Sequence, residues 1–128
     1  IEDWAKFILM HVDVHEASKV GLTETSLKRL HMQPDSASWR KGAEERGYGI
    51  PSLNYAMGWY TLTTERDETV LWHPGGNSGF IAQALIDLSA GNAILAATNV
   101  RTSQGHLFRA MEQINNHYSA IAHLPKLN

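Results

Sequence analysis

The chain has 128 residues, of which 43% are hydrophobic and 19% charged, a composition typical of one globular domain and not of a disordered segment. Its net charge of −2 gives no electrostatic basis for binding nucleic acid or an anionic membrane, and no apolar run approaches the length of a membrane span. The lack of cysteine excludes disulfides and thiolate metal sites and leaves the cellular compartment undetermined.

The chain begins at Ile1 without an initiator methionine or a signal-peptide pattern, so we expect it to come from a longer protein. A complete small protein that lost only its first residue is the alternative. Two helices are predicted near this end. An apolar stripe at helical spacing predicts a first helix to about residue 16; it consists of Ile1, Trp4, Ala5, Ile8, Leu9 and Val12. Thr23 can cap a second helix, which Pro34 ends.

A change of period predicts strands in the second half of the chain. Residues 35–54 are polar and rich in glycine, which indicates a long loop. The segments YAMGWYTLT (55–63) and ETVLWH (68–73) are typical of strands joined by a polar turn. The segments GFIAQALIDL (79–88) and AILAATN (93–99) form a second such pair, and the turn residues favour antiparallel hairpins.

A closing helix completes the predicted order of elements. Its apolar stripe consists of Leu107, Ala110, Met111, Ile114, Tyr118 and Ile121. The expected fold is therefore α+β, with two N-terminal helices and one C-terminal helix packed on an antiparallel sheet of about four strands. Residues 1–128 are expected to form a single segment, since we find no internal repeat and no low-complexity stretch.

The stretch WHPGGNSGF, residues 72–80, combines a histidine, a proline and three glycines. Pro74 cannot donate a ladder hydrogen bond and so suits an edge strand, and the glycines let a ligand or another backbone come close. An open strand edge can pair with an extended substrate or polarise a carbonyl oxygen, with the imidazole of His73 beside it. The alternative is a glycine-rich hairpin connection that merely lies near a histidine. A phosphate-binding loop fits neither the spacing nor the strand that follows.

The ordered segments YAMGWY, WHPGGNSGF and IAQALIDLSAGNAILAATN resemble the C-terminal part of the serine β-lactamase and penicillin-binding-protein-like family. The resemblance is narrower to the branch that holds class C β-lactamases, esterases and D-aminopeptidases. The front segments IEDWAKFILM and LTETSLKRLHMQP resemble the helices that precede the Gly-Trp strand of that family. The resemblance therefore spans residue 1 to about residue 118 and implies that the chain is part of a β-lactamase-like fold.

The resemblance also implies roles for individual residues. His73, Pro74 and Gly75 match the His-x-Gly motif on the strand that lines the active-site cleft. The backbone N–H of Gly76 would be one of two oxyanion donors, so His73 and Gly76 are the candidate catalytic residues. The candidate substrate-binding residues are His73, Gly75, Gly76 and Asn77. The substrate would be a small molecule or peptide, and no cofactor or metal is implied.

The nucleophile of this family, a serine in a Ser-x-x-Lys motif on a buried helix, is not evident here. The one formal match is Ser38 to Lys41, which we discount because it lies in the polar loop and close to His73. No Tyr-x-Asn motif occurs. We therefore expect the nucleophile on a missing N-terminal part of the same protein or on another chain. The alternative is a non-catalytic binding module derived from the same fold.

Two further features bear on specificity. Penicillin-recognising members of the family usually carry threonine at the position of Pro74, and proline has no hydroxyl for a substrate carboxylate. We therefore expect esterase, amidase or peptidase specificity rather than efficient β-lactam hydrolysis. His11 and His15 have a spacing that metal ligands can use on one helix face, but no third ligand is evident, so we interpret them as partly buried helix histidines.

Overall fold

The structure, a computed structural model, describes residues 1–32, 54–64, 67–100 and 104–118. Within these ranges it contains helices α1 (Glu2–Val12), α2 (Val14–Ser18), α3 (Glu24–His31) and α5 (Gln104–Tyr118), and strands β1 (Asn54–Tyr55), β2 (Tyr60–Thr63), β3 (Thr69–Asn77), β4 (Phe80–Asp87) and β5 (Asn92–Thr98). This α+β class confirms the predicted one. No helix in the described ranges is long and apolar enough to cross a lipid bilayer.

The five strands form one antiparallel sheet in which each strand pairs with its neighbours in sequence, in the order β1-β2-β3-β4-β5. The β3–β4 hairpin is the longest pairing of the sheet and runs from Val70 opposite Asp87 to Asn77 opposite Phe80. The connections are short turns, which is what consecutive antiparallel strands require. The fold therefore places the motif of residues 72–80 in the middle of the sheet and along its longest strand.

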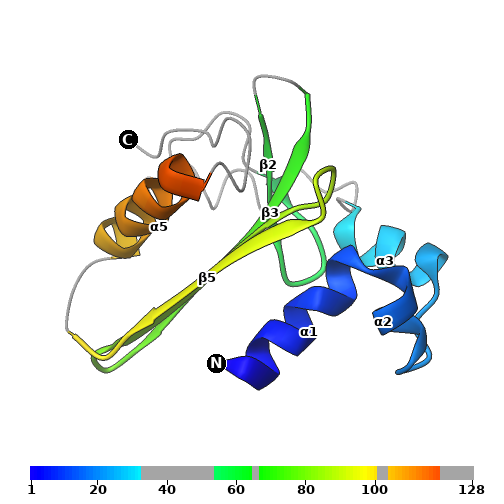
Figure 1. Cartoon of the computed structure of the whole chain (residues 1–128), viewed down its shortest axis with the longest axis horizontal. Coiled ribbons are helices and arrows are strands. Elements are labelled where there is room, and N and C mark those ends of the chain that lie inside the picture. Colours follow the sequence, from blue (N-terminus) through cyan, green and yellow to red (C-terminus); the bar gives the residue numbers. More distant parts are fainter. Residues whose placement is uncertain (33–53, 65–66, 101–103, 119–128) are drawn as a thin grey trace.

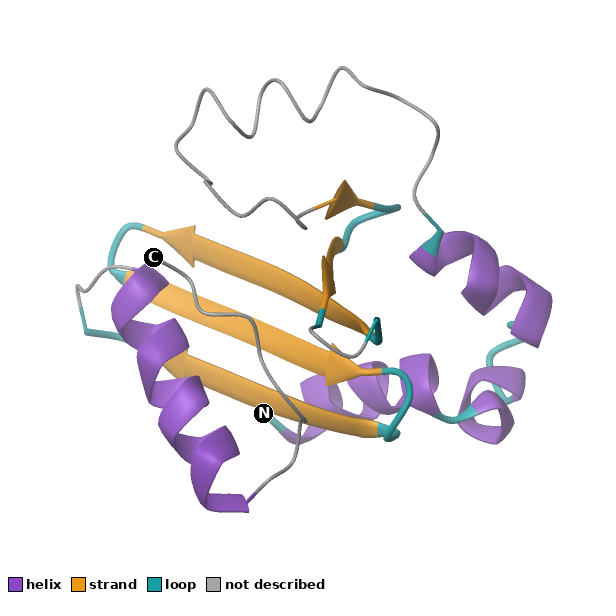
Figure 2. Ribbon diagram, turned by 90° about the horizontal axis from the view of Figure 1, so that it is seen from above, coloured by secondary structure: helices purple, strands orange, loops and turns teal. Residues whose placement is uncertain are grey.

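Helices cover both faces of the sheet (Figures 1 and 2), and two apolar clusters result. Successive side chains of a strand point to opposite faces, so each strand contributes to both clusters. The cluster beneath α5 consists of Leu62, Val70, Trp72, Leu85, Ile94, Phe108 and Met111. The cluster beneath α1 consists of Ile8, Trp59, Leu71, Ala84 and Ile86.

The predicted single helix to residue 16 is wrong, because the chain breaks at Asp13. This residue is extended, with φ of −121° and ψ of 108°. Its carboxylate accepts hydrogen bonds from the backbone N–H of His15 (2.8 Å) and Glu16 (3.4 Å), so it caps a separate helix, α2. The predicted stripe is also only partly correct: Ile8 is buried, whereas Leu9 is exposed.

The predicted cap of the second helix is confirmed, since Thr23 Oγ1 accepts a hydrogen bond from the Ser26 backbone N–H at 3.1 Å. The helix ends at His31. The predicted helix stop at Pro34 and the predicted loop of residues 35–54 lie outside the described residues, apart from Asn54 at the start of β1.

The predicted strand of residues 55–63 is divided in two by a tight turn. Gly58 has φ of +88°, a conformation that favours glycine, and the Ala56 backbone N–H donates to the Trp59 carbonyl at 2.7 Å. The turn separates the two-residue strand β1 from β2 and places Trp59 in the core. A fifth strand therefore appears where about four were expected.

The closing helix is present as α5, but its buried face differs from the predicted stripe. Leu107 and Met111 are buried as expected, and Phe108 is buried with them. Ala110 and Ile114 are exposed. Helical spacing alone therefore located the helix and misplaced its apolar face by part of a turn, because Phe108 was not assigned to that face.

Candidate functional site

Strand β3 extends beyond the end of its pairing with β2. Its pairing with β2 ends where Trp72 lies opposite Tyr60, whereas its pairing with β4 continues to Asn77. In the part of the chain that the structure describes, residues 73–77 therefore have a strand partner on the β4 side alone. The edge strand expected for Pro74 is therefore wrong as stated: β3 is the middle strand of the five, and only its second half lacks a described partner on the β2 side.

The turn that closes the β3–β4 hairpin shows which backbone groups face the open border. Ser78 and Gly79 form a two-residue turn with φ of +40° and +114°, as a type I′ turn requires. Such a turn makes Asn77 and Phe80 a hydrogen-bonded pair, and the pattern alternates from there along the hairpin. The N–H of Gly75 therefore points to β4, and the N–H of Gly76 points to the open border.

Pro74 agrees with this alternation. Its nitrogen lies on the same side of β3 as that of Gly76, so a proline here costs no hydrogen bond to β4. The proline carbonyl faces the same border. The border thus presents one donor, the N–H of Gly76, and the carbonyls of residues 74 and 76.

The imidazole of His73 is exposed and lies against Trp59. The two ring centroids are 5.8 Å apart, and the rings are nearly perpendicular, at 77°. Trp59 is itself buried in the cluster beneath α1, so it packs against one side of the His73 ring. The ring thus lies at the start of the open border, exposed and in contact with Trp59.

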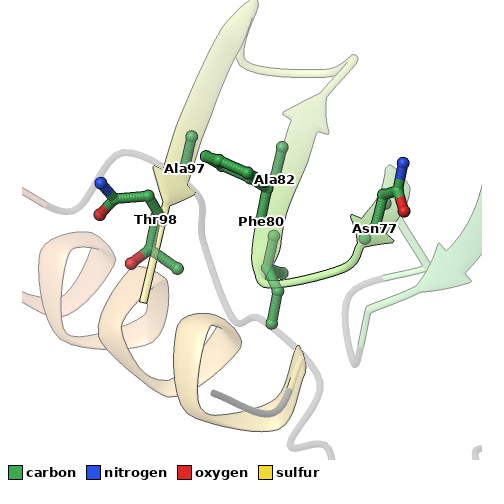
Figure 3. Close-up of a pocket in the computed structure, with 9 residues that line it drawn as sticks. Asn77, Phe80, Ala82, Ala97 and Thr98 are labelled. Carbon is green, nitrogen blue, oxygen red and sulfur yellow. The ribbon is translucent and has the colours of Figure 1, made fainter. Parts of the chain in front are cut away.

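Two cavities meet on this part of the sheet. The larger one, of about 660 Å³, is lined by residues at the far ends of three strands: Gly75, Gly76 and Asn77 on β3, Phe80, Ile81 and Ala82 on β4, and Ala97, Thr98 and Asn99 at the end of β5. Figure 3 shows the labelled side chains around it, with Asn77 across the hairpin from those of β5. The Asn77 amide oxygen accepts a hydrogen bond from the Ser78 hydroxyl at 2.9 Å.

The structure thus brings together all four residues that the resemblance assigned to the site. His73, Gly75, Gly76 and Asn77 follow one another along the open border and line the two cavities. The discounted match at Ser38 lies outside the described residues.

The histidine pair interpreted from spacing is arranged differently. His15 is exposed on α2, whereas His11 is buried and approaches His31 of α3, with 2.9 Å between His11 Nδ1 and His31 Nε2. No group of three or more metal-ligating side chains occurs among the residues that the structure describes. No pattern in the sequence indicates this contact, because residues 11 and 31 are brought together only by the packing of α1 against α3.

Burial changes the acid–base chemistry of this pair. Burial of the ring lowers the pKa of His11 to about 4, and the charge of the neighbouring His31 adds a smaller lowering. Burial also lowers the pKa of His31. The His11 ring contacts Trp59, with centroids 4.9 Å apart, so an aromatic series runs from His31 through His11 and Trp59 to His73.

The fold and this border define the class of the protein as an α+β domain whose long central strand, among the described residues, has a strand partner on one side alone from residue 73 to residue 77. Comparison of the chain with protein-family models, with curated proteins and with solved structures gives no match. A functional proposal therefore depends on the geometry of the border and on the motifs that lie along it.

Proposed function

We propose that this chain is the C-terminal part of a β-lactamase-like serine hydrolase that acts on an ester, amide or peptide. In this proposal β3 lines the active-site cleft, and the chain supplies His73 and one oxyanion donor, the N–H of Gly76. The serine nucleophile and its lysine base belong to an N-terminal part of the same protein or to a second chain. The described chain alone is then inactive.

The observation that carries the proposal is the unequal length of the two pairings of β3. Pairing with β2 ends at Trp72 and pairing with β4 continues to Asn77. The backbone N–H of Gly76 is therefore directed away from the sheet and is not used by a described strand. A main-chain donor held in this way is pre-organised, since the β3–β4 ladder fixes its direction before a substrate arrives.

The chemistry follows from this direction. When the serine oxygen of the missing part adds to the scissile carbonyl carbon, the π electron pair moves to the carbonyl oxygen. The N–H of Gly76 stabilises the negative charge there, and the lysine base takes the serine proton. Collapse of the intermediate expels the alcohol or amine, which takes that proton. The exposed His73 can donate a hydrogen bond to a polar group of the substrate.

The second candidate is a binding module without catalysis. The lack of a Tyr-x-Asn motif and of a Ser-x-x-Lys motif on a predicted helix favours it, because these motifs carry the reaction in the family that the chain resembles. In this case the same border binds an extended ligand by its backbone groups. The two candidates differ in whether an activated serine forms when the parent protein is complete.

A serine-directed fluorophosphonate probe tests the proposal on this chain alone and on the chain together with the N-terminal half of its parent. We expect no labelling of the chain alone and labelling of a serine in the N-terminal half when both are present. Labelling of Ser38 in the chain alone would show that the discounted motif is the nucleophile. No labelling of the complete parent would favour the binding module.

Two variants at one position isolate the proposed donor. Gly76→Pro removes the N–H, whereas Gly76→Ala keeps it and adds one methyl group. We expect Gly76→Pro to slow labelling of the complete protein by about 10²- to 10³-fold, as the loss of one oxyanion donor does. Gly76→Ala controls for the added bulk. Equal labelling rates for the two variants would remove Gly76 from the proposed site.

A further inference from the structure

A second cavity, of about 480 Å³, lies next to the border on the α1 side of the sheet. Three parts of the chain surround it. Helix α1 contributes Trp4 and Phe7, the turn before β2 contributes Met57 and Trp59, and the sheet contributes His73 of β3 and Ala84 of β4. Its volume lies within the range of small-molecule sites, about 300–1,000 Å³.

The walls of this cavity are apolar, although they are open to solvent. Phe7 is 46% exposed and Met57 is 61% exposed. The floor is formed by Gly75 and by the alanines of β4, whose side chains are at most a methyl group, so the aromatic walls stand above it. His73 is the one titratable side chain among the described lining residues, and none of them is an aspartate, glutamate, lysine or arginine.

This lining selects the chemistry of a ligand. Aromatic rings pack well against offset or perpendicular aromatic rings, and methionine adapts its shape to an apolar group. A charged group would lose its hydration here without gaining an opposite charge. The cavity therefore favours an uncharged aryl or alkyl group over an anion, a cation or a metal ion.

The position of the cavity connects it to the proposed reaction. Gly75 and Ala82, which lie opposite each other on β3 and β4, line both this cavity and the larger one that contains Gly76. We propose that this aromatic cavity binds the uncharged aryl or alkyl group of a small substrate whose carbonyl lies at the N–H of Gly76. The assignment of the carbonyl rests on the proposed hydrolase function, whereas the binding of the apolar group does not.

A binding titration of the 128-residue chain tests the inference without any turnover. Phenylacetamide is the probe, because it is neutral and carries one aryl group, and acetamide is the matched compound without the ring. We expect phenylacetamide to shift the indole N–H signals of Trp4 and Trp59 saturably in two-dimensional NMR spectra. Acetamide at the same concentrations should leave these signals in place.

Two variants on one helix provide the control. Phe7→Ala removes a wall of the cavity, whereas Leu9→Ala removes an apolar side chain of similar exposure, 44%, that does not line it. We expect Phe7→Ala to weaken phenylacetamide binding roughly five- to tenfold, as the loss of an aromatic contact does. Leu9→Ala should bind as the unchanged chain does. If Phe7→Ala does not fold, Met57→Ala, at a more exposed position, replaces it.

The outcomes separate the two proposals. Absence of saturable shifts, or equal weakening in Phe7→Ala and Leu9→Ala, would overturn the inference, even if the complete parent reacts with a fluorophosphonate. Selective weakening in Phe7→Ala would support it, even if the complete parent proves unreactive and the hydrolase proposal falls.

Discussion

Gly76 and Pro74 lie two positions apart on β3, and the backbone nitrogens of both face the border that β2 leaves open. Pro74 has no backbone N–H. Gly76 has one, and no side chain of its own covers it. The border therefore presents a single donor between two carbonyls. A single donor at a defined place suits recognition of one carbonyl oxygen better than extension of the sheet by a long added strand.

The buried pair of His11 and His31 predicts a dependence of stability on pH. The His11 pKa is lowered to about 4, whereas an unfolded histidine keeps a value near 6.5. Between these values the unfolded chain binds more protons, so the stability contributed by neutral His11 is complete above pH 6.5 and is lost as the pH falls towards 4. We expect urea unfolding to show a loss on the order of 1–2 kcal/mol between pH 7 and pH 4.5 from this pair.

The control for this prediction replaces one ring at a time. His11→Phe keeps an aromatic ring against Trp59 but cannot take up a proton, so the loss of stability between pH 7 and pH 4.5 should become smaller. His15→Gln changes the exposed histidine of α2 and should leave the loss as it is. The same loss in His11→Phe and the unchanged chain would assign the effect to other groups, such as the carboxylates.

At the scale of elements, the sequence predicts best where one rule acts alone. The pattern of apolar runs bounded by turn residues located β4 and β5 to within one residue, and β4 is buried at nearly every position, as a strand covered on both faces is. The same pattern predicted one strand at residues 55–63 where the structure has two, because the turn at Gly58 depends on a single left-handed residue inside an apolar run. It also missed the break at Asp13, where a side-chain cap outweighs the helical spacing of its neighbours.

The candidate site was predictable for a different reason. His73, Gly75 and Gly76 are consecutive or nearly so, and a strand carries such residues along one border without any distant contact. The wall of the aromatic cavity was not predictable, because Phe7 and Met57 meet His73 only through the packing of α1 and of the turn before β2 on the sheet. Local residues therefore give the polar part of the site, and tertiary packing gives its apolar part.

The register of β3 makes a prediction of its own. Gly75→Pro removes an N–H that points to β4 and should destabilise the chain by on the order of 1–3 kcal/mol, since the β4 carbonyl opposite is left without its donor. Gly76→Pro removes an N–H that points to the open border and should be nearly neutral. Urea unfolding of the two variants measures the difference. Equal destabilisation would show that the border near residue 76 is closed by another part of the chain.

At the scale of the whole molecule, several strands of the described sheet have a side without a described partner. They include the border of residues 73–77 and the outer sides of β1 and β5, the first and last strands of the described sheet. Exposed strand edges favour unwanted pairing, so proteins usually shorten, charge or cover them. This arrangement supports the proposal that further polypeptide completes the fold, and it places the candidate site where such a part would meet the chain.

The completed protein should then hydrolyse simple esters faster than penicillins. Pro74 offers no hydroxyl for the carboxylate that penicillins carry, and the described lining of the aromatic cavity offers that carboxylate no lysine or arginine. Rates with 4-nitrophenyl acetate and with a penicillin, measured on the chain together with its N-terminal half, check this. Pro74→Thr should raise the penicillin rate by about tenfold, the effect of one hydrogen bond to a charged group. Pro74→Ala restores the N–H without the hydroxyl and should not. Faster turnover of penicillin than of the ester by the unchanged protein would contradict the assigned specificity, because binding of the carboxylate would then need no hydroxyl at this position.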